Sequence, residues 1–440
     1  MQNQETNEIL ESHERIISSL ERQLSFFSNL IEWSVILTST LDLDELIHKV
    51  LALSQKAMRC EASNVMLLNE KTGQLKCRAA LGTVGQQLEE DFTLEMGQGI
   101  AGWVAENRTG VVVTDVSKDE RFYRGVDSRT GFITRSILCA PLIVQDKLLG
   151  VSQVINPVDG KKFNEEDLKL FETFCRGVAV SVQNSQMHRR LLNNHRVEQQ
   201  LEMASIIQQG FLPRSFDLKS GGKFEIAAVN LPASMVGGDL YDCFQLRPDL
   251  FALTIGDVSG KGVPAALYMA RLLSDFRSRV FNQLEDLVGT MQTLNEELTE
   301  RSRQGMFVTM IYLNIDVSRG LLRYVNGGHI PPMLFRKPGK KIDRLDAGEG
   351  IPLGIMKTAV YEEACLKLEA GDTVVLFSDG VLDAKNSKGE TFTIKKIQKV
   401  IRGKWDTADE LISAFVQALK KHMGEENQFD DITVVVLRWC

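Results

Sequence analysis

Several features are scarce in this 440-residue sequence, and each absence narrows the class of protein. The seven cysteines are scattered and form no CxxC pair, which argues against structural zinc and against a disulfide framework. No run of 18 apolar residues occurs, and the N-terminus (MQNQET) is too polar for a secretory signal. Basic residues are not in excess either: the sequence has 51 Lys and Arg and 58 Asp and Glu, which gives a net charge of −7. We therefore expect a cytoplasmic protein without nucleic acid or membrane as a partner.

The remaining composition is that of an ordinary globular protein. Hydrophobic residues make up 43% of the chain and charged residues 25%, and the length suits two to three domains. Cys60, Cys77 and Cys139 could serve a redox or haem role, but a buried, small apolar side chain is the expected state of each.

Acidic residues recur beside glycine, or next to apolar and β-branched runs, in the second half of the chain. The segments are 237–242 (GGDLYD), 255–262 (IGDVSGKG), 377–380 (FSDG) and 429–433 (FDDIT). Residues 251–255 and 373–377 are expected to be strands that end just before an aspartate, and 432–437 a strand that begins just after the last pair. Any one segment could be a simple Asp–Gly turn. Four of them favour a carboxylate cluster at one sheet edge, which suits a hard divalent cation.

The order GGDxxD, GDVSGKG, FSDG, DDIT resembles the PPM family of metal-dependent (type 2C) protein phosphatases, and within it the bacterial SpoIIE-type branch. The resemblance covers residues 211–440 and includes NGGHIPP at 326–332. It implies an α+β fold, with two stacked antiparallel sheets between helices, and two Mn²⁺ or Mg²⁺ ions. The implied ligands are Asp239, Asp257, the Val258 carbonyl, Asp379 and Asp430.

Other polar residues in these motifs receive supporting roles. Asp431 stands where many relatives have Asn and is expected to support the site, while Asp242 is expected to be structural. Ser259 and Ser378 have no histidine partner in their motifs and are interpreted either as turn residues or as residues that support the ligands. Further candidates are Lys261 or Arg271 as a phosphate-orienting residue, and His329 as either a structural imidazole or a proton donor.

The first half of the chain predicts a mixed α/β domain. Asp42 is expected to cap a helix running through Leu53, and Asn164 to cap a later one. Strands are expected at 63–68, 75–80, 111–114, 137–144 and 150–155, with a short helix after the glycines at 97–102. This order, with GQGIAGWVAENRTGVVVTDV, resembles a GAF domain over residues 29–185. A small-molecule or protein signal is implied; Pro157 and Leu168 depart from the cyclic-nucleotide signature.

The sequence thus divides into four regions. They are an N-terminal helix (1–28), the GAF sensory domain (29–185), a helical signalling linker (186–212) and the phosphatase domain (213–440). Helix is expected from residue 171 to about 212, and its apolar residues could pair in a homodimer.

The resemblance implies a signal-regulated serine/threonine phosphatase acting on a phosphorylated STAS-type anti-anti-sigma factor in a bacterial partner-switching pathway. A catalytically silent sensory scaffold with the same fold is the alternative. A nucleotide cyclase is disfavoured, because Leu240 and Tyr241 break the GGDEF pattern that residues 237–239 begin.

Overall fold

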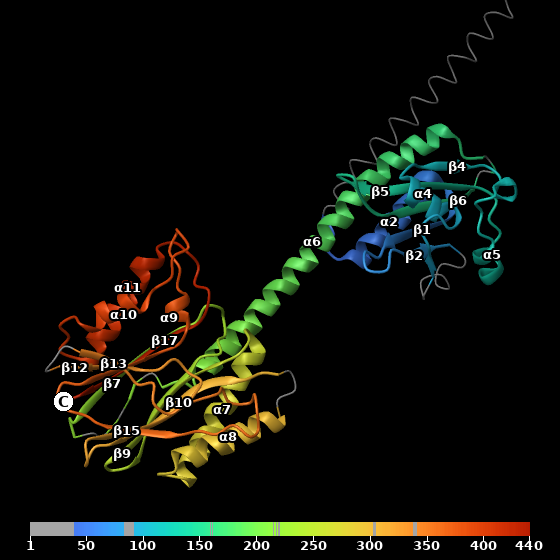
Figure 1. Ribbon diagram of the computed structural model, residues 1–440. Coiled ribbons are helices and arrows are strands. Elements are labelled where there is room, and N and C mark those ends of the chain that lie inside the picture. Colours follow the sequence, from blue (N-terminus) through green and yellow to red (C-terminus); the bar gives the residue numbers. More distant parts are fainter. Residues whose placement is uncertain are drawn as a thin grey trace, which may run out of the picture. The chain divides into compact units, whose positions relative to one another are not determined.

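In the computed structural model, the described residues are 39–440 apart from 83–91, 159, 161, 214, 217, 219–220, 302–304 and 338–340. The chain forms two compact units, one ending at Arg196 and the other running from Val197 to Cys440 (Figure 1). The helix predicted at 171–212 is confirmed as α6 (Glu165–Gln209), whereas the helix predicted at 1–28 lies outside the described residues. No helix in the described ranges is long and apolar enough to cross a membrane.

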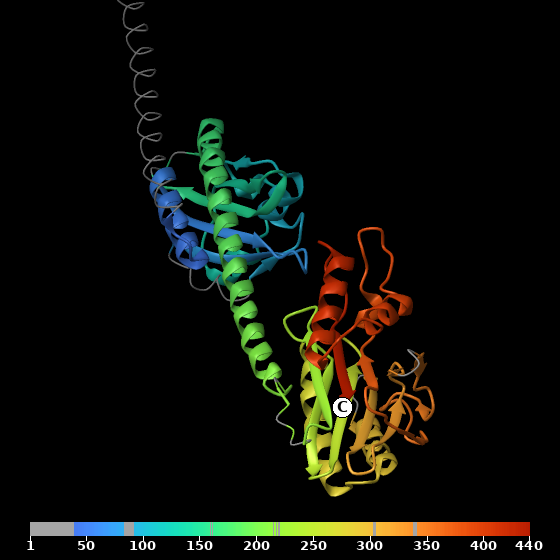
Figure 2. The ribbon, with the colours of Figure 1, turned by 90° about the vertical axis from the view of Figure 1, so that its left-hand side faces the viewer.

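The N-terminal unit is built on an antiparallel sheet with the order β3-β2-β1-β6-β5-β4. All the strands predicted for this region are present, as is the short helix after the glycines. Helix α2 and the first half of α6 cover one face of the sheet (Figure 2), and α4 packs on the other. In chain order the elements are α2 (Leu43–Met58), β1 (Cys60–Leu68), β2 (Leu75–Leu81), β3 (Thr93–Leu94), α4 (Gly99–Asn107), β4 (Val111–Val113), η1 (Val116–Lys118), α5 (Gly125–Thr130), β5 (Ile137–Val144) and β6 (Lys147–Pro157).

Both predicted helix caps are present. Asp42 accepts hydrogen bonds from the backbone N–H groups of Asp44 and Glu45, at 3.0 and 2.9 Å. Asn164 accepts from the N–H groups at the start of α6 in the same way. The predicted end of the first helix at Leu53 is wrong. The helix continues to Met58, which still packs against the core, and it stops where Arg59 takes a left-handed conformation with φ 48°.

The cysteines of the N-terminal unit are buried and free. Burial raises the pKa of the Cys60 and Cys139 thiols to about 12, so that neither is a thiolate near neutral pH. Cys77 is also buried, and it forms no disulfide bond. These three residues therefore fit the expected role of small apolar core residues.

The C-terminal unit contains two stacked sheets, with the orders β14-β11-β10-β9-β8 and β13-β12-β16-β17-β7. A further strand, β15, pairs with β11. The pairing is antiparallel except for the short contact between β11 and β14. In chain order the elements are β7 (Phe224–Leu231), β8 (Leu240–Arg247), β9 (Leu250–Val258), α7 (Val263–Asn282), α8 (Leu287–Arg301), β10 (Val308–Asp316), β11 (Leu321–Gly327), β12 (Met333–Arg336), β13 (Lys341–Arg344), β14 (Glu349–Gly350), β15 (Glu363–Lys367), β16 (Thr373–Phe377), α9 (Gly380–Asp383), α10 (Ile394–Ile401), α11 (Ala408–Met423) and β17 (Ile432–Trp439).

Helices cover the outer face of each sheet in this unit. Helices α7 and α8 pack on the β9 sheet, and α10 and α11 lie on the β17 sheet (Figure 1). The alternation along β17 shows the layers: Val435 and Leu437 belong to the core between the sheets, whereas Val434 and Val436 belong to the core under α11. The predicted α-β-β-α sandwich is therefore confirmed.

Two of the three strand boundaries near the aspartates are as predicted, since β16 ends at Phe377 and β17 begins at Ile432. The third is wrong. Strand β9 does not end before Asp257 but runs through it to Val258, because Asp257 stays paired with Thr309 of β10. The Asp257 side chain therefore projects from a strand whose neighbours on both sides are hydrogen-bonded.

Candidate functional site

The four predicted acidic segments gather where the two sheets meet. Asp239 directly precedes β8, Asp257 lies near the end of β9, and these strands are neighbours in one sheet. Asp379 follows β16 and Asp430 precedes β17, which are neighbours in the other sheet. Segments separated by up to 190 residues in the sequence therefore supply one carboxylate cluster.

Asp239 is the most deeply buried of these acids, with 3% of its surface exposed. Thr433 Oγ1 donates a hydrogen bond of 2.6 Å to Asp239 Oδ2, and the Ser378 hydroxyl group lies near this carboxylate. Burial, and next the charge of Asp257, nevertheless raise the pKa of Asp239 well above its usual range. The hydroxyl groups hold the carboxylate in place but do not offset its loss of solvent.

Asp257 faces the other acids of the cluster. Burial raises its pKa to about 7, and the charges of Asp379, Asp430 and Asp431 add to the effect. The pKa of Asp379 is also raised, first by burial and then by the charge of Asp430. Such mutual repulsion between carboxylates is relieved either by protons or by a cation.

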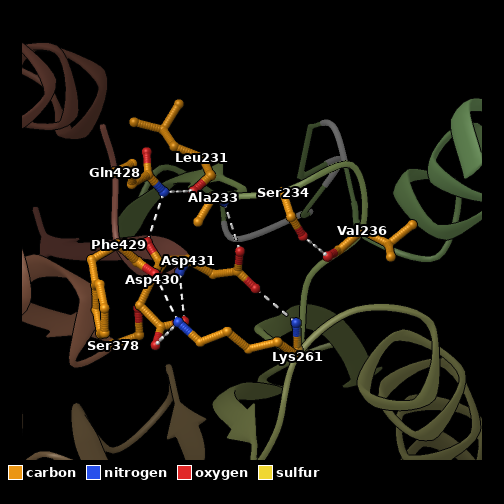
Figure 3. A network of polar contacts seen from close by, with 11 residues as sticks. Leu231, Ala233, Ser234, Val236, Lys261, Ser378, Gln428, Phe429, Asp430 and Asp431 are labelled. Atoms are coloured by element: carbon orange, nitrogen blue, oxygen red, sulfur yellow. Dashed lines mark hydrogen bonds and ion pairs between the residues drawn. The ribbon is translucent and has the colours of Figure 1, made fainter. Parts of the chain in front are cut away.

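Asp430 has a basic neighbour from the loop before α7. Lys261 Nζ lies 3.0 Å from Asp430 Oδ2 and donates a hydrogen bond of 2.7 Å to the Phe429 carbonyl (Figure 3). The same ammonium group lies 4.2 Å from the centre of the Phe429 ring, an exposed phenyl group. Lys261 therefore brings a positive charge to the rim of the acidic cluster. Arg271, the other predicted phosphate contact, pairs instead with Asp275 on its own helix.

Asp431 holds the backbone of the segment that leads to Asp239. Its two carboxylate oxygens accept hydrogen bonds from the N–H groups of Ala233 (2.8 Å) and Gly238 (2.7 Å), and Figure 3 shows the Ala233 contact. A Cβ atom at Gly237 would lie 2.2 Å from Asp431 Oδ2, so only glycine fits this close approach. The arrangement agrees with the supporting role predicted for Asp431.

The other polar residues of the motifs have structural partners. Asp242 is buried, and its two carboxylate oxygens accept hydrogen bonds from Nε and Nη2 of Arg277. Ser259 Oγ accepts a hydrogen bond from the Phe307 N–H (2.8 Å). Ser378 Oγ donates to the Asp431 carbonyl (3.1 Å) and accepts from the Thr433 N–H (3.0 Å). Each serine thus ties its motif to a segment that is distant in the sequence.

His329 is buried beside the cluster but is tied into a turn. The Asn326 side chain accepts from the His329 N–H and donates to its carbonyl, and His329 Nδ1 lies 3.0 Å from Thr309 Oγ1. Burial lowers the pKa of the imidazole to about 4, so it is neutral at physiological pH. These contacts favour the structural alternative over the proton donor.

The chemistry of the donor set fits hard divalent cations. A Cβ atom built on Gly238 would lie 2.7 Å from the Val258 carbonyl oxygen and 3.2 Å from Asp257 Oδ1, so two oxygens face the same small space. Carboxylate and carbonyl oxygens are the ligands that Mg²⁺ and Mn²⁺ take. Among the described residues, however, no three acidic, histidine or cysteine side chains already converge on a common metal position. Asp239 is turned to Thr433 and Asp430 to Lys261 instead.

The sequence patterns assign no role to two residues that contact Asp239 or the backbone just before it. Thr433 belongs to the DDIT motif, whose pattern indicates no role for it, and its hydroxyl group is a direct donor to Asp239. Gln208, at the end of α6, forms two hydrogen bonds with the Gly237 backbone. No pattern in the segment 208–213 (QQGFLP) indicates this contact.

Comparisons with known proteins agree with both halves of the fold. Residues 247–440 match the family model for stage II sporulation protein E (SpoIIE), and residues 42–182 match that for the GAF domain. The chain is 30% identical over 269 residues to Protein IcfG of Synechocystis sp.. It is 28% identical over 243 residues to the phosphoserine phosphatase RsbU of Bacillus subtilis. The SiaA-PP2C domain of Pseudomonas aeruginosa has the same fold as the C-terminal unit, with a TM-score of 0.50 at 22% identity.

The alignments cover these proteins unequally. They include 54% of this chain and 41% of IcfG, and 55% of this chain and 70% of RsbU. The structural alignment with SiaA-PP2C covers 56% of this chain and 99% of that domain. This chain therefore spans less than half of the length of IcfG.

Proposed function

Because the chain joins a GAF domain to a SpoIIE-type phosphatase domain, we propose that it is a signal-regulated protein phosphatase that hydrolyses phosphoserine or phosphothreonine. The gathering of Asp239, Asp257, Asp379 and Asp430 at the meeting edges of the two sheets carries this proposal. The similarity to a relative named phosphoserine phosphatase supports it.

The residues that would hold two Mn²⁺ or Mg²⁺ ions are Asp239, Asp257, the Val258 carbonyl, Asp379 and Asp430. Such ions supply an acidified water and neutralise charge on the phosphoryl group. Thr433 and Asp431 orient Asp239 and its backbone, and so define where the ligands lie. Lys261 is close enough to Asp430 to donate to a phosphoryl oxygen bound beside it.

The substrate that we propose is a phosphorylated STAS-type anti-anti-sigma factor, as in the partner-switching pathways of this branch. The proposal follows the resemblance of residues 211–440 to SpoIIE-type phosphatases. Lys261 and the exposed Phe429 at the rim of the site suit a protein substrate, which can contact both the charged group and the ring.

A signal at the GAF domain would bind in a cavity of about 90 Å³ within the N-terminal unit. The cavity is lined mainly by apolar side chains, and Asn64 and Gln153 provide polar atoms. The Asn64 amide donates to Gln153 Oε1 (3.1 Å), while Asn64 Oδ1 has no partner among the described residues. Because the carboxylate of Asp127 also lines the cavity, a small, largely apolar molecule with a hydrogen-bond donor fits this lining better than an anion.

The signal would pass to the phosphatase domain through α6, and we propose that α6 also pairs in a homodimer. Its second half exposes large apolar side chains, among them Leu191 (64%), Met203 (67%) and Ile207 (66%). Contiguous apolar residues on a solvent-exposed helix are typical of a helix-pairing surface.

A catalytically silent sensory scaffold is the second candidate. One observation favours it: the described carboxylates do not converge on a shared metal position, and Asp430 is paired with Lys261. In an active enzyme, the same carboxylates would reorient when the cations bind.

The deciding experiment measures phosphate release from para-nitrophenyl phosphate and from a phosphoserine STAS protein, with Mn²⁺, with Mg²⁺ and with EDTA. We expect release that requires metal and is lost in Asp379→Asn. The matched control is Asp409→Asn, an exposed acid in the first turn of α11. Binding of Mn²⁺ without release of phosphate from either substrate would favour the scaffold, if it is found both in wild type and in the isolated residues 197–440.

A further inference from the structure

The last turn of α6 reaches the candidate site through one side chain. Gln208 Nε2 donates a hydrogen bond to the Gly237 carbonyl, and Gln208 Oε1 accepts one from the Gly237 N–H at 3.1 Å. A primary amide is the side-chain group that can satisfy the donor and the acceptor of one residue at the same time. Gln208 is therefore joined to Gly237 at two points.

The backbone at Gly237 has little freedom to move away from this contact. On its other side, Asp431 Oδ2 lies so close that a Cβ atom would come within 2.2 Å of it. The next residue, Gly238, donates its N–H to the same carboxylate at 2.7 Å and lies against the Val258 carbonyl. Residues 237 and 238 are thus held between Gln208 and Asp431.

Asp239 follows these two residues directly, and its carboxylate must reach Thr433 across the gap between the sheets. A shift of the Gly237 backbone would be passed to Asp239 within two residues. A cavity of about 10 Å³, lined by Gln208, Leu212 and Asp239 among others, lies beside the contact. This volume is close to that needed for one water molecule, so the side chains around the contact have little room to move.

We propose that Gln208 is a positioning residue for Asp239, and that the end of the linker helix thereby sets how well the acidic cluster binds a divalent cation. The proposal rests on the proposed function, in which Asp239 is a metal ligand. Gln208 touches neither the phosphoryl group nor the carboxylate. It acts through the Gly237 backbone, so that bending or unwinding of the last turn of α6 changes the position of Asp239.

The test uses the full chain with Gln208→Ala, which removes both hydrogen bonds, and Gln208→Met, which removes them but keeps a side chain of similar length. Gln200→Ala is the matched control, since Gln200 is an exposed glutamine on the same helix. Mn²⁺ affinity is measured by titration calorimetry without substrate. We expect both Gln208 variants to bind Mn²⁺ about 10- to 100-fold more weakly, the usual effect of losing a residue that supports a ligand.

A second measurement does not depend on metal. Hydrogen exchange of the Gly237 and Gly238 amides, followed in EDTA, should be faster in both variants than in wild type and in Gln200→Ala. Unchanged exchange at these amides, or unchanged Mn²⁺ affinity in folded Gln208→Met, would overturn the proposal. If wild type itself binds no Mn²⁺, the proposed function fails, while the exchange rates still decide whether Gln208 holds the segment.

Discussion

The Thr433 hydroxyl group joins the two sheets at Asp239. It accepts a hydrogen bond from Asn230 Nδ2 at 2.8 Å, which directs its own proton to Asp239 Oδ2 at 2.6 Å. Asn230 and Thr433 are opposite each other in β7 and β17, whereas Asp239 directly precedes β8 of the other sheet. A neutral side chain therefore orients a buried carboxylate through a defined donor.

Replacing this hydroxyl group should reduce the affinity of the site for Mn²⁺ and, to a smaller extent, the free energy of unfolding. In Thr433→Val, Asp239 loses a donor and Asn230 an acceptor, which should cost about 1–3 kcal/mol of unfolding free energy without metal. Mn²⁺ affinity should fall about tenfold or more, because the carboxylate is no longer oriented. Titration calorimetry and urea unfolding measure the two effects.

Two variants control for this prediction. Thr433→Ser keeps the hydroxyl group and should retain most of the Mn²⁺ affinity. Thr299→Val removes a hydroxyl group that donates to the Asn295 carbonyl on its own helix, α8, and should leave Mn²⁺ binding unchanged. Equal Mn²⁺ affinity in wild type and Thr433→Val would show that the hydroxyl group does not orient Asp239 for metal.

The sequence predicted which carboxylates gather but not what holds them. The strand ends beside Asp379 and Asp430 predict where these residues lie, because an apolar strand next to an aspartate is recognisable from a few consecutive residues. The contacts of Thr433 with Asp239, and of Gln208 with Gly237, join residues 194 and 29 positions apart. They depend on how one sheet stacks on the other and on where α6 ends, and neither is encoded in a local pattern.

The same limit explains the errors in the predicted element boundaries. The apolar run at 251–255 suggested a strand ending before Asp257, but pairing with β10 extends the strand through it. The GAF and sandwich folds were predicted because long motifs in a fixed order specify them. Boundaries depend on neighbouring strands and on single residues such as Arg59, whose left-handed conformation ends α2.

Without metal, the stability of the C-terminal unit should fall as pH rises from about 4 to about 7. In this window the folded state still holds protons on Asp239 and Asp257, whose pKa values are raised, the latter to about 7. The unfolded chain releases them near an ordinary aspartate pKa of about 3.9. Neutral His329, whose pKa is lowered to about 4, acts in the opposite sense below about pH 6.5, but it is one group against two. The folded state thus binds more protons in total, and the free energy of unfolding decreases with pH until both carboxyl groups are ionised.

Calorimetric unfolding in EDTA between pH 5 and 8 measures this decline. Asp257→Asn should reduce the slope, because one of the raised groups is removed. Saturating Mn²⁺ should reverse the trend, since a cation binds the ionised carboxylates and stabilises the folded state. A stability that rises from pH 5 to 7 in EDTA would contradict the pKa directions given for these acids.

Lys261 should matter for phosphate release and little for stability. Its ion pair with Asp430 involves a side chain that is 57% exposed, so Lys261→Met should change the unfolding free energy by less than about 1 kcal/mol. Release of phosphate should fall at least about tenfold if the ammonium group contacts the phosphoryl oxygens. Mn²⁺ affinity should not fall, because the Lys261 ammonium group no longer competes with Mn²⁺ for the Asp430 carboxylate.

Lys399→Met is the control for this prediction, since Lys399 is exposed on α10 and lies outside the site. Steady-state kinetics with the phosphoserine protein at several Mn²⁺ concentrations separate the two effects. Weaker Mn²⁺ binding with unchanged release at saturating Mn²⁺ would assign Lys261 to the support of Asp430 instead of phosphate.

The exposed apolar residues of α6 should mediate self-association. Met203 and Ile207 are one helical turn apart and are 67% and 66% exposed, so they form a continuous apolar surface. Replacing both by Glu places two charges where a second helix would pack, and should shift a dimer to monomer in light scattering at micromolar concentration. Glu202→Lys, a charge reversal at the exposed residue just before Met203, controls for charge alone. A wild-type chain that is monomeric at the highest soluble concentration would rule out pairing through this surface, because apolar contacts of this kind strengthen with concentration by mass action.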